Sequence, residues 1–416
     1  MDWITEPERK TPVIAEVDVL VCGGGFAGVA AAVSAARNGV RVLLLEKYGF
    51  LGGLCTAALV ITTPPLDNGI NLTIASLLKE RHVYVPCRNS GPEVEGLNLH
   101  AIDPEILKYE FVRLLQKHDV DFLFHTYIAA PIMDGRTVCG VVVENKAGRQ
   151  AIKAKMIVDA TGDADIAAAA GAPFRLVRKP MTMMFNIVGV DTDRVLSEWG
   201  SWNGIKNAID GARRSGELEF SLGIHPEFGS PGVYAEKLIY PGELNVWSGN
   251  LLNMNGVDPR DLTQAEVVTR EHAFRMSEFL RKKIPGFESS RIEITSTQVG
   301  VRATRQISGE ASPNSEEVRR CEFPDTVAKP YAKSSMRLPY GSILPRNVEN
   351  LLVAGRCISA EEEAMGHLRL LPVCSATGEA AGTAIALALK QDLSPRNLNV
   401  SLLQRTLMEQ GVKLTE

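Results

Sequence analysis

Three glycines and one acid near the start of the chain have the types and spacing to hold a dinucleotide. Gly23, Gly25 and Gly28 form a Gly-x-Gly-x-x-Gly motif, and Glu46 lies eighteen residues after the last of them. The first glycine permits a tight turn, the second lets the backbone approach a pyrophosphate, and the third lets a helix pack closely on a strand. An acid at this distance can accept hydrogen bonds from a ribose diol. The spacing therefore predicts a dinucleotide site.

The elements around these residues are those that such a site needs. An apolar strand over 17–22 leads into the glycines, an alanine-rich helix covers 29–37, and a second strand over 40–45 ends at Glu46. The free N–H groups and partial positive charge at the helix N-terminus favour phosphate. A bare glycine motif also occurs in turns that bind nothing, but the two strands and the acid favour a ligand. These residues do not say which dinucleotide binds.

Later segments return to the same pattern of strands and helices. We expect helices over 71–81, 103–118 and 372–389, and strands over 121–128, 138–144, 150–158 and 350–354. Asp103 and Pro104 are a strong helix start. The strand ending at Asp159 runs into Ala160-Thr161-Gly162, where backbone can approach a ligand closely. In the alternative interpretation, Thr161 or Asp163 caps a following helix.

Composition changes near Pro173, from which point tryptophan, methionine and asparagine become more frequent. We interpret 173–331 as an inserted α+β substrate domain, between a nucleotide-binding domain of 1–172 and its second part, 332–416. The clearest element of the insertion begins at Asp258-Pro259, where Thr263 and Glu266 suggest a capping box for a long helix that reaches about Lys283. The predicted fold class is α/β, a Rossmann-type domain with a mostly parallel sheet plus the insertion. No second glycine motif follows a strand, so we expect one dinucleotide site.

Composition excludes several classes of function. Of 416 residues, 45% are hydrophobic and 23% charged, and the net charge is −4 with no Lys/Arg-rich run, which argues against a nucleic-acid partner. No apolar stretch reaches membrane-spanning length and the first residues lack the apolar core of a signal peptide, so we expect a cytoplasmic protein with no membrane partner. Seven scattered cysteines without a Cys-x-x-Cys pair argue against a metal site. We expect Cys55, Cys357 and Cys374 to pack as small apolar side chains.

Several segments together carry a family resemblance that spans nearly the whole chain. They are 23–28, 46–47, 52–56, 159–163, 261–266, 300–305, 350–359 and 366–372. In this order they resemble the FAD-dependent oxidoreductases of the glutathione-reductase-like flavoprotein superfamily, and within it the family with a single FAD-binding Rossmann domain. The resemblance implies that the dinucleotide is FAD and that 1–172 and 332–416 form the FAD-binding domain.

The resemblance also implies roles for individual residues. Gly23, Gly25 and Gly28 would hold the pyrophosphate, and Glu46 the adenosine ribose. Further residues expected at the cofactor are Phe26, Ala27, Lys47, Gly52, Gly53, Thr56, Ile128, Ala129, Ala160, Thr161, Gly162, Gly355, Arg356, Pro372 and Val373. Among these, the Ile128–Ala129 backbone would meet the adenine. The N-terminus of the 372–389 helix would stabilise negative charge on reduced flavin.

Two side chains between the flavin segments are candidates for catalysis. We predict His367 as proton donor or acceptor and Arg369 as the group that holds a substrate carboxylate. Relatives often have Ala-His-Gly-Ser where this chain has Ala364-Met365-Gly366-His367, which displaces the imidazole by two positions. His367 could instead be a loop residue without a role, and Arg369 could pair with the acids at 361–363.

Other residues have less definite roles. Of Arg302 and Arg305, we expect one to brace the two domains rather than both to take part in catalysis. His225, Tyr340 and the 181–185 stretch are candidates for the substrate pocket.

The leading hypothesis is an FAD-dependent oxidoreductase that moves a hydride to or from flavin N5 on a small organic substrate. The alternatives are a non-redox biosynthetic or group-transfer enzyme on the same fold and an NAD-dependent dehydrogenase. The sequence does not identify the substrate or the electron acceptor or donor. It also leaves the oligomeric state open, with a homo-oligomer as one alternative.

Overall fold

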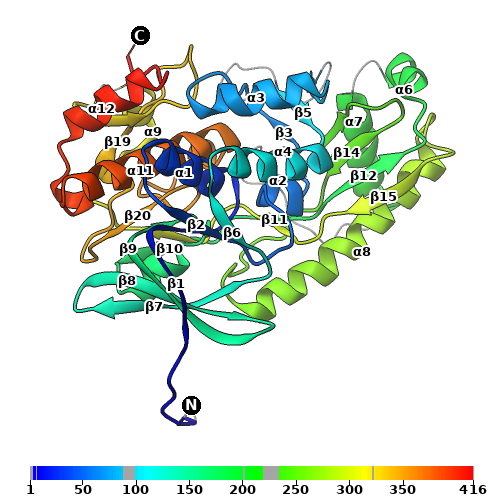
Figure 1. The fold of residues 1–416 in the computed structure, drawn as a ribbon. Coiled ribbons are helices and arrows are strands. Elements are labelled where there is room, and N and C mark those ends of the chain that lie inside the picture. Colours follow the sequence, from blue (N-terminus) through cyan, green and yellow to red (C-terminus); the bar gives the residue numbers. More distant parts are fainter. Residues whose placement is uncertain are drawn as a thin grey trace.

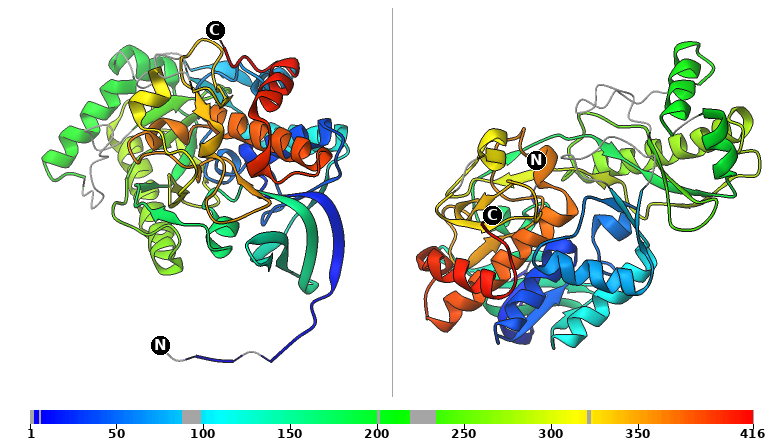
Figure 2. Two further views of the ribbon diagram at one scale, coloured as in Figure 1. Left: turned by 90° about the vertical axis from the view of Figure 1, so that its left-hand side faces the viewer. Right: turned by 90° about the horizontal axis from the view of Figure 1, so that it is seen from above.

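The computed structural model describes residues 3–5, 7–87, 99–199, 202–218, 234–320 and 323–415 of the chain. The described chain forms two units, a larger one around a mostly parallel sheet and a smaller one around an antiparallel sheet (Figure 1). Views from two further sides show the smaller unit extending beside the larger one (Figure 2).

The larger unit is built on a seven-stranded sheet. Its strands are β1 (Val13–Cys22), β2 (Val42–Leu45), β6 (Asp121–Leu123), β7 (Tyr127–Asp134), β8 (Thr137–Asn145), β9 (Gly148–Asp159) and β20 (Leu351–Val353). Parallel pairing joins β6, β2, β1, β9 and β20 in that order, whereas the β7–β8 hairpin is antiparallel and pairs with the first half of β9. The strand from near the C-terminus thus enters the sheet begun at the N-terminus. This confirms the predicted α/β fold with a mostly parallel sheet.

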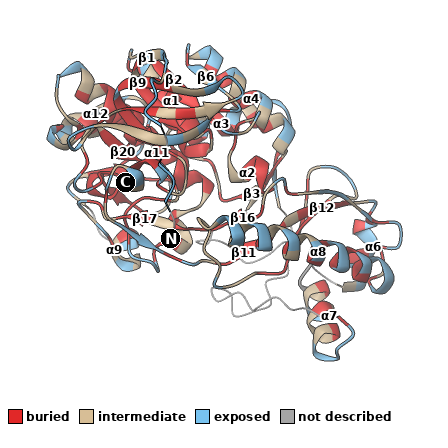
Figure 3. Ribbon diagram, turned by 90° about the horizontal axis from the view of Figure 1, so that it is seen from below, coloured by how far each residue is buried: buried red, intermediate tan, exposed pale blue. Residues whose placement is uncertain are grey.

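Two buried helices pack closely against each other on this sheet. They are α1 (Phe26–Arg37) and α11 (Leu371–Lys390), both rich in alanine. A Cβ at Gly378 would lie 2.1 Å from the Ala27 carbonyl oxygen, and one at Gly382 would lie 2.1 Å from that of Ala31. Only glycine allows the two backbones to approach this closely. Figure 3 shows the resulting core as the largest buried region of the ribbon.

Further helices cover the larger unit. They are α3 (Ile70–Glu80), α4 (Pro104–Lys117) and α12 (Val400–Glu409). The predicted start of α4 is confirmed, because the Asp103 carboxylate accepts hydrogen bonds from the backbone N–H groups of Glu105 and Ile106 at 2.8 and 3.0 Å. Helix starts with a proline and an acid can therefore be read from sequence.

The smaller unit has its own sheet, helices and core. Its antiparallel strands run in the order β13 (Tyr234–Lys237), β14 (Leu244–Trp247), β12 (Met184–Val188) and β15 (Arg291–Thr295), and its helices are α6 (Thr192–Trp199), α7 (Trp202–Arg214) and α8 (Pro259–Lys283). Buried apolar side chains of β12, β14 and α8 form a core separate from the main one. Here the predicted start is confirmed but the capping box is wrong: the N-cap of α8 is Asp258, which accepts from the Arg260 N–H.

Short paired strands connect the two units. β10 (Phe174–Leu176) pairs with β17 (Arg305–Ile307), and β11 (Met181–Thr182) pairs with β16 (Gly300–Val301). The remaining elements are α2 (Leu54–Ala57), β3 (Thr62–Thr63), β4 (Tyr84–Pro86), β5 (His100–Ile102), α5 (Asp165–Ala169), α9 (Ser315–Arg320), β18 (Thr326–Ala328), β19 (Leu338–Pro339) and α10 (Met365–Leu368), with 3-10 turns at Tyr340–Ser342 and Pro395–Asn397. From Ile307 onward, buried side chains such as Val318 and Tyr331 belong to the core of the larger unit.

In the part of the chain that the structure describes, no helix is both long enough and apolar enough to cross a membrane.

Candidate functional site

The carboxyl ends of four parallel strands meet at one edge of the large sheet, and a pocket opens there. Its lining includes residues 23–27 after β1, 46–48 after β2, 160–163 after β9 and 354–356 after β20. The pocket and its mouth enclose about 1600 Å³ of space not filled by protein atoms, open solvent at the mouth included. Open α/β sheets bind ligands at this edge. The pocket is therefore the candidate site.

The glycine turn has the geometry expected for a phosphate cradle. Gly23 has φ +109°, a conformation that favours glycine, and a Cβ at Gly28 would lie 1.7 Å from the Gly23 carbonyl oxygen. The helix α1 starts from Gly25, and among the described residues no side chain caps it. The first N–H groups of α1 are thus left for a ligand. Gly53 lies close against this turn, since a Cβ placed on Gly53 would lie 2.9 Å from the Gly25 Cα. The observed cradle fits a pyrophosphate.

Glu46 stands beside this turn with its carboxylate already oriented. It is 7% exposed and accepts hydrogen bonds from the backbone N–H groups of Gly24 at 2.7 Å and Tyr48 at 2.9 Å. Burial raises the pKa of Glu46, and the two N–H donors oppose that rise. Since a carboxylate offers about four lone-pair sites, acceptor capacity remains for a ribose diol.

The turn after β9 lies at the pocket and leads into α5. Thr161 and Gly162 line the pocket, while the Thr161 hydroxyl accepts from the Asp165 N–H at 3.0 Å and donates to Asp159 at 2.7 Å. The buried Asp159 carboxylate also accepts from two N–H groups in the first turn of α5, at 2.9 Å each. Of the two interpretations of this turn, the capping one is only partly right: the Thr161 hydroxyl accepts from the Asp165 N–H, but the N-cap residue of α5 is Ala164. Contact of this turn with a ligand stays a prediction.

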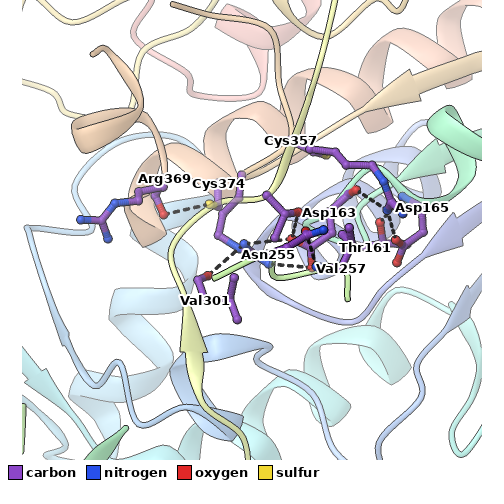
Figure 4. Close-up of polar contacts among 12 residues, drawn as sticks. Thr161, Asp163, Asp165, Asn255, Val257, Val301, Cys357, Arg369 and Cys374 are labelled. Carbon is purple, nitrogen blue, oxygen red and sulfur yellow. Dashed lines mark hydrogen bonds and ion pairs between the residues drawn. The ribbon is translucent and has the colours of Figure 1, made fainter. Parts of the chain in front are cut away.

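Asp163 joins the two units beside the pocket, and Figure 4 shows the contacts around it. Its carboxylate forms an ion pair with Arg356 through two contacts of 3.3 Å and accepts from the Thr304 hydroxyl at 2.6 Å. Arg356 also donates to the Val301 carbonyl at 3.0 Å. Arg305 donates to the Asp163 carbonyl at 3.1 Å and pairs with Asp165 at 2.8 Å, so Arg305 is the arginine of its segment that braces the units.

A second wall of the pocket comes from segments outside the nucleotide-type turns. Apolar residues dominate it, with Thr182, Gln298 and Arg302 among them; the apolar members are Val60, Pro64, Leu99, Met184, Trp247, Val301, Leu370 and Leu371. The Tyr48 hydroxyl donates to the Gln298 side chain, which links the two walls. Of the earlier pocket candidates, the 181–185 stretch contributes Thr182 and Met184, Tyr340 is buried with its hydroxyl bonded to the Pro395 carbonyl, and His225 lies outside the described residues.

Most of the residues expected at the cofactor come together in this pocket, and some do not. Those in the lining are Gly23, Gly25, Phe26, Ala27, Glu46, Lys47, Gly52, Gly53, Ala160, Thr161, Gly162, Gly355 and Arg356. Those outside it are Gly28, Thr56, Ile128, Ala129, Pro372 and Val373. The Thr56 hydroxyl donates to the Leu51 carbonyl at 2.7 Å, and Ile128 is paired with Val143 in the β7–β8 hairpin.

The two residues predicted for catalysis are separated. Arg369 lines the pocket, and its side chain points away from the Asp163 cluster (Figure 4). His367, on the short helix α10, is not part of the lining, and its Nε2 lies 2.6 Å from Arg319 Nη2. A role for His367 in proton transfer stays a prediction.

Three buried cysteines near the site have no acidic thiol. Burial raises the pKa of Cys374 to about 11, and burial also raises the pKa of Cys55 and of Cys357. Cys374 lines the pocket and its Sγ lies 3.4 Å from the Arg369 carbonyl oxygen, to which it donates. Because the thiolate is the reactive form, these values favour the packing interpretation.

Comparison with known proteins finds relatives that match part of the chain. It is similar to digeranylgeranylglycerophospholipid reductase 1 of Methanococcoides burtonii, with 26% identity over 195 residues that cover 43% of this chain and 46% of that protein. The match thus covers less than half of that relative's length.

Solved structures share the fold at low identity. A geranylgeranyl bacteriochlorophyll reductase-like protein from Thermoplasma acidophilum gives a TM-score of 0.56 at 14% identity, covering 96% of this chain and 85% of that one. A p-nitrophenol 4-monooxygenase from Pseudomonas putida gives 0.53 at 15% identity, covering 95% and 84%. At these identities the likeness shows the fold alone.

The family model described as FAD dependent oxidoreductase matches residues 18–333 and 329–407, nearly the whole chain. The chain therefore belongs to the FAD dependent oxidoreductase family, and it is an enzyme whose cofactor is FAD.

Proposed function

We propose that this enzyme transfers a hydride between flavin N5 and a small organic substrate bound against the second wall of the pocket. The observation that carries the proposal is that one continuous pocket is lined by the nucleotide-type turns of the large sheet and by largely apolar residues of the other segments. FAD, when bound, supplies hydride acceptance or donation at N5. The protein has to hold, orient and desolvate the reactants.

We assign the cofactor to the residues that form the cradle. The first N–H groups of α1 and the Gly23–Gly25 backbone would bind the pyrophosphate, and Glu46 the adenosine ribose. Arg356, held by Asp163, would close the cofactor site from the C-terminal side. The helix α11, which among the described residues also lacks a side-chain cap, begins at the pocket through Leu371, so its N-terminus would favour negative charge on the flavin.

On the substrate side, apolar residues would exclude water and Arg369 would hold an anionic group. His367 is proposed as the proton donor or acceptor, because it lies on α10 two residues before Arg369, which lines the pocket. If a His367→Gln variant keeps full turnover across the pH range in which imidazole titrates, this role is excluded.

Two finer assignments belong with this proposal. We propose the glutathione-reductase-like superfamily as the wider grouping, supported by the parallel sheet and its glycine turn. We also propose 1–172 with 332–416 as the FAD-binding domain and 173–331 as the substrate domain. The separate core at 185–287 supports the insertion. Ile307, Val318 and Tyr331 pack on the core of the larger unit, so their packing does not support the last part of the proposed substrate domain.

The experiment uses the purified protein. It should show flavin absorption bands and release FAD on denaturation. Under anaerobic conditions, at least one member of a panel of apolar and anionic organic compounds should either bleach the flavin band or, after chemical reduction of the flavin, restore it. Flavin that stays inert in both directions, together with turnover of a non-redox substrate, would reject hydride transfer and favour a biosynthetic role of the fold.

A further inference from the structure

Buried polar side chains join α3 to the N-terminal end of α11. Asn71, in the first turn of α3, is fully buried, and its Nδ2 donates to the Pro372 carbonyl oxygen at 3.0 Å. The hydroxyl of Ser375, which is also fully buried, donates to Asn71 Oδ1. The Asn71 amide therefore bonds both to the backbone and to a side chain at the start of α11.

A further contact joins the same two helices one turn along α11. The Ile70 N–H donates to both carboxylate oxygens of Glu379, at 3.0 and 3.1 Å, and this glutamate is 3% exposed. The helices are so close here that a Cβ on Gly69 would lie 2.2 Å from Glu379 Oε2. Contacts at two successive turns fix both the position and the rotation of this end of α11 against α3.

These contacts lie outside the pocket, next to the part of α11 that borders it. Leu371 and Cys374 line the pocket. Asn71 and Ser375 are not part of the lining. The Ser375 hydroxyl also lies within hydrogen-bond distance of two carbonyl oxygens of its own helix, those of Leu371 and Pro372, at 3.0 and 3.2 Å. Ser375 therefore does not need Asn71 to satisfy its hydroxyl, and what the amide adds is a fixed link between α3 and the turn at the pocket.

We propose that Asn71 is a positioning residue for the flavin. By holding the first turn of α11, it sets the distance between the helix N-terminus and FAD, and with it the relative affinity of the enzyme for reduced and oxidised FAD. The stabilisation of negative charge by a helix N-terminus falls off within the first turn, so a small displacement of this turn matters. This inference rests on the proposed function, which assigns the N-terminus of α11 to the flavin, but its measurement needs no substrate.

The test is the midpoint reduction potential of the FAD-loaded protein, measured without oxygen against a reference dye. Asn71→Ala removes both bonds of the amide to α11. We expect the affinity for reduced FAD relative to oxidised FAD to fall about threefold to thirtyfold, the range of a helix N-terminus acting on a nearby charge. A tenfold fall corresponds to a potential lower by about 30 mV.

Two variants of Ser375 carry the test if the Asn71→Ala protein does not fold. Ser375→Ala removes one bond to the amide and should shift the potential in the same direction by a smaller amount. Ser375→Thr keeps a hydroxyl and should retain the wild-type potential.

A second measurement follows the helix itself. Amide hydrogen exchange of the FAD-loaded protein, read from a peptide covering 371–378, reports how often the first turns of α11 open. Asn71→Ala should speed this exchange about tenfold, because two buried hydrogen bonds are lost. The matched control is Asn399→Ala, which removes the N-cap of α12, where Asn399 Oδ1 accepts from the N–H groups of Ser401 and Leu402 at 3.0 and 3.3 Å. This variant should lower Tm but change neither the potential nor the exchange rate of 371–378.

Distinct outcomes overturn the inference and the proposed function. An unchanged potential in both Asn71→Ala and Ser375→Ala would overturn the inference, whether or not hydrogen exchange becomes faster. An equal shift of the potential in Asn399→Ala would also do so, because loss of stability alone would then account for it. A flavin that an organic compound bleaches, with a potential that none of these variants changes, would support hydride transfer and reject the inference. A potential that depends on Asn71, in a flavin that no organic compound bleaches or reoxidises, would do the opposite.

Discussion

The close packing of α1 on α11 predicts the effect of adding one methyl group at Gly378. This residue is buried in the middle of α11 and has no positive φ, so the helical backbone itself accepts alanine. The new Cβ would lie 2.1 Å from the Ala27 carbonyl oxygen and 2.9 Å from the Ala27 carbonyl carbon. Cβ atoms in proteins essentially never approach another heavy atom closer than 3.0 Å. Since the opposing atoms are backbone, relief requires that one helix move. Ala27 lines the pocket, so the movement reaches the cofactor site.

The magnitude follows from two opposing effects. Overpacking a well-filled core costs roughly 1–3 kcal/mol, and a clash with backbone belongs at the upper end of that range. Replacing glycine by alanine in a helix stabilises it by about 1 kcal/mol. The net loss for Gly378→Ala is therefore about 2 kcal/mol, which at roughly 1 °C per kcal/mol for a chain of 416 residues lowers Tm by about 2 °C.

The matched control is Gly211→Ala in α7. No heavy atom lies within 4 Å of a Cβ placed there, and the residue is also helical. This variant should gain about 0.5–1 kcal/mol from helix propensity alone. The assay is the thermal unfolding of both variants and the wild type, with and without added FAD, followed by the FAD retained after gel filtration. A Gly378→Ala protein as stable as the Gly211→Ala protein, with full FAD retention, would refute the close helix contact.

Three further predictions concern charged groups. Glu46→Ala should weaken FAD retention by roughly 1–3 kcal/mol because the ribose hydroxyls would lose a charged acceptor, and equilibrium dialysis measures this; unchanged affinity would remove Glu46 from the site. Asp163→Asn should lower stability by roughly 1–3 kcal/mol, below the 3–5 kcal/mol of a fully buried pair, because Asp163 is 25% and Arg356 12% exposed in their side chains. An unaltered urea midpoint would contradict that assignment. Burial raises the pKa of Glu379 to about 7 from its usual 4.5, so between these pH values the folded protein binds one proton more than the unfolded chain and stability falls as pH rises from about 5 to 8. Glu379→Gln should flatten the plot of Tm against pH over this range. Plots of the same slope for variant and wild type would show that another group titrates.

Local signals explain what could be predicted from sequence. Gly23 and Gly28 need particular backbone conformations and contacts, and the flanking strand and helix follow directly from the same stretch of chain. Asp103 caps α4 through its own neighbours. The capping box at Thr263 failed because Asp258 and Pro259 provide an earlier start of the same type, and the helix takes the longer span.

The second wall of the pocket could be predicted only in part. The 181–185 stretch was a candidate for it, but the segments that lie beside this stretch could not be predicted, because non-local pairing brings them there. Thr182 reaches Arg302 through the pairing of β11 with β16, and Met184 meets Trp247 through that of β12 with β14. None of these segments has a periodic pattern long enough to predict the strand with which it pairs. The sequence does not distinguish the roles of Arg302 and Arg305. Only the fold shows that Arg302 lines the pocket while Arg305 braces the units.

The packing of α11 on α1 also links cofactor binding to the joining of the two ends of the chain. Both helices begin at the pocket, and among the described residues neither has a side-chain cap, so FAD bound as proposed would contact both, through its pyrophosphate at α1 and its flavin at α11. A ligand that binds only the folded protein stabilises it by about 2.7 kcal/mol at a hundredfold excess over Kd. That gain is similar to the loss expected for Gly378→Ala, so saturating FAD should return this variant close to the Tm of the FAD-free wild type. Rescue of this size requires that the helices can still dock; if the methyl group prevents docking altogether, added FAD will leave Tm where it was.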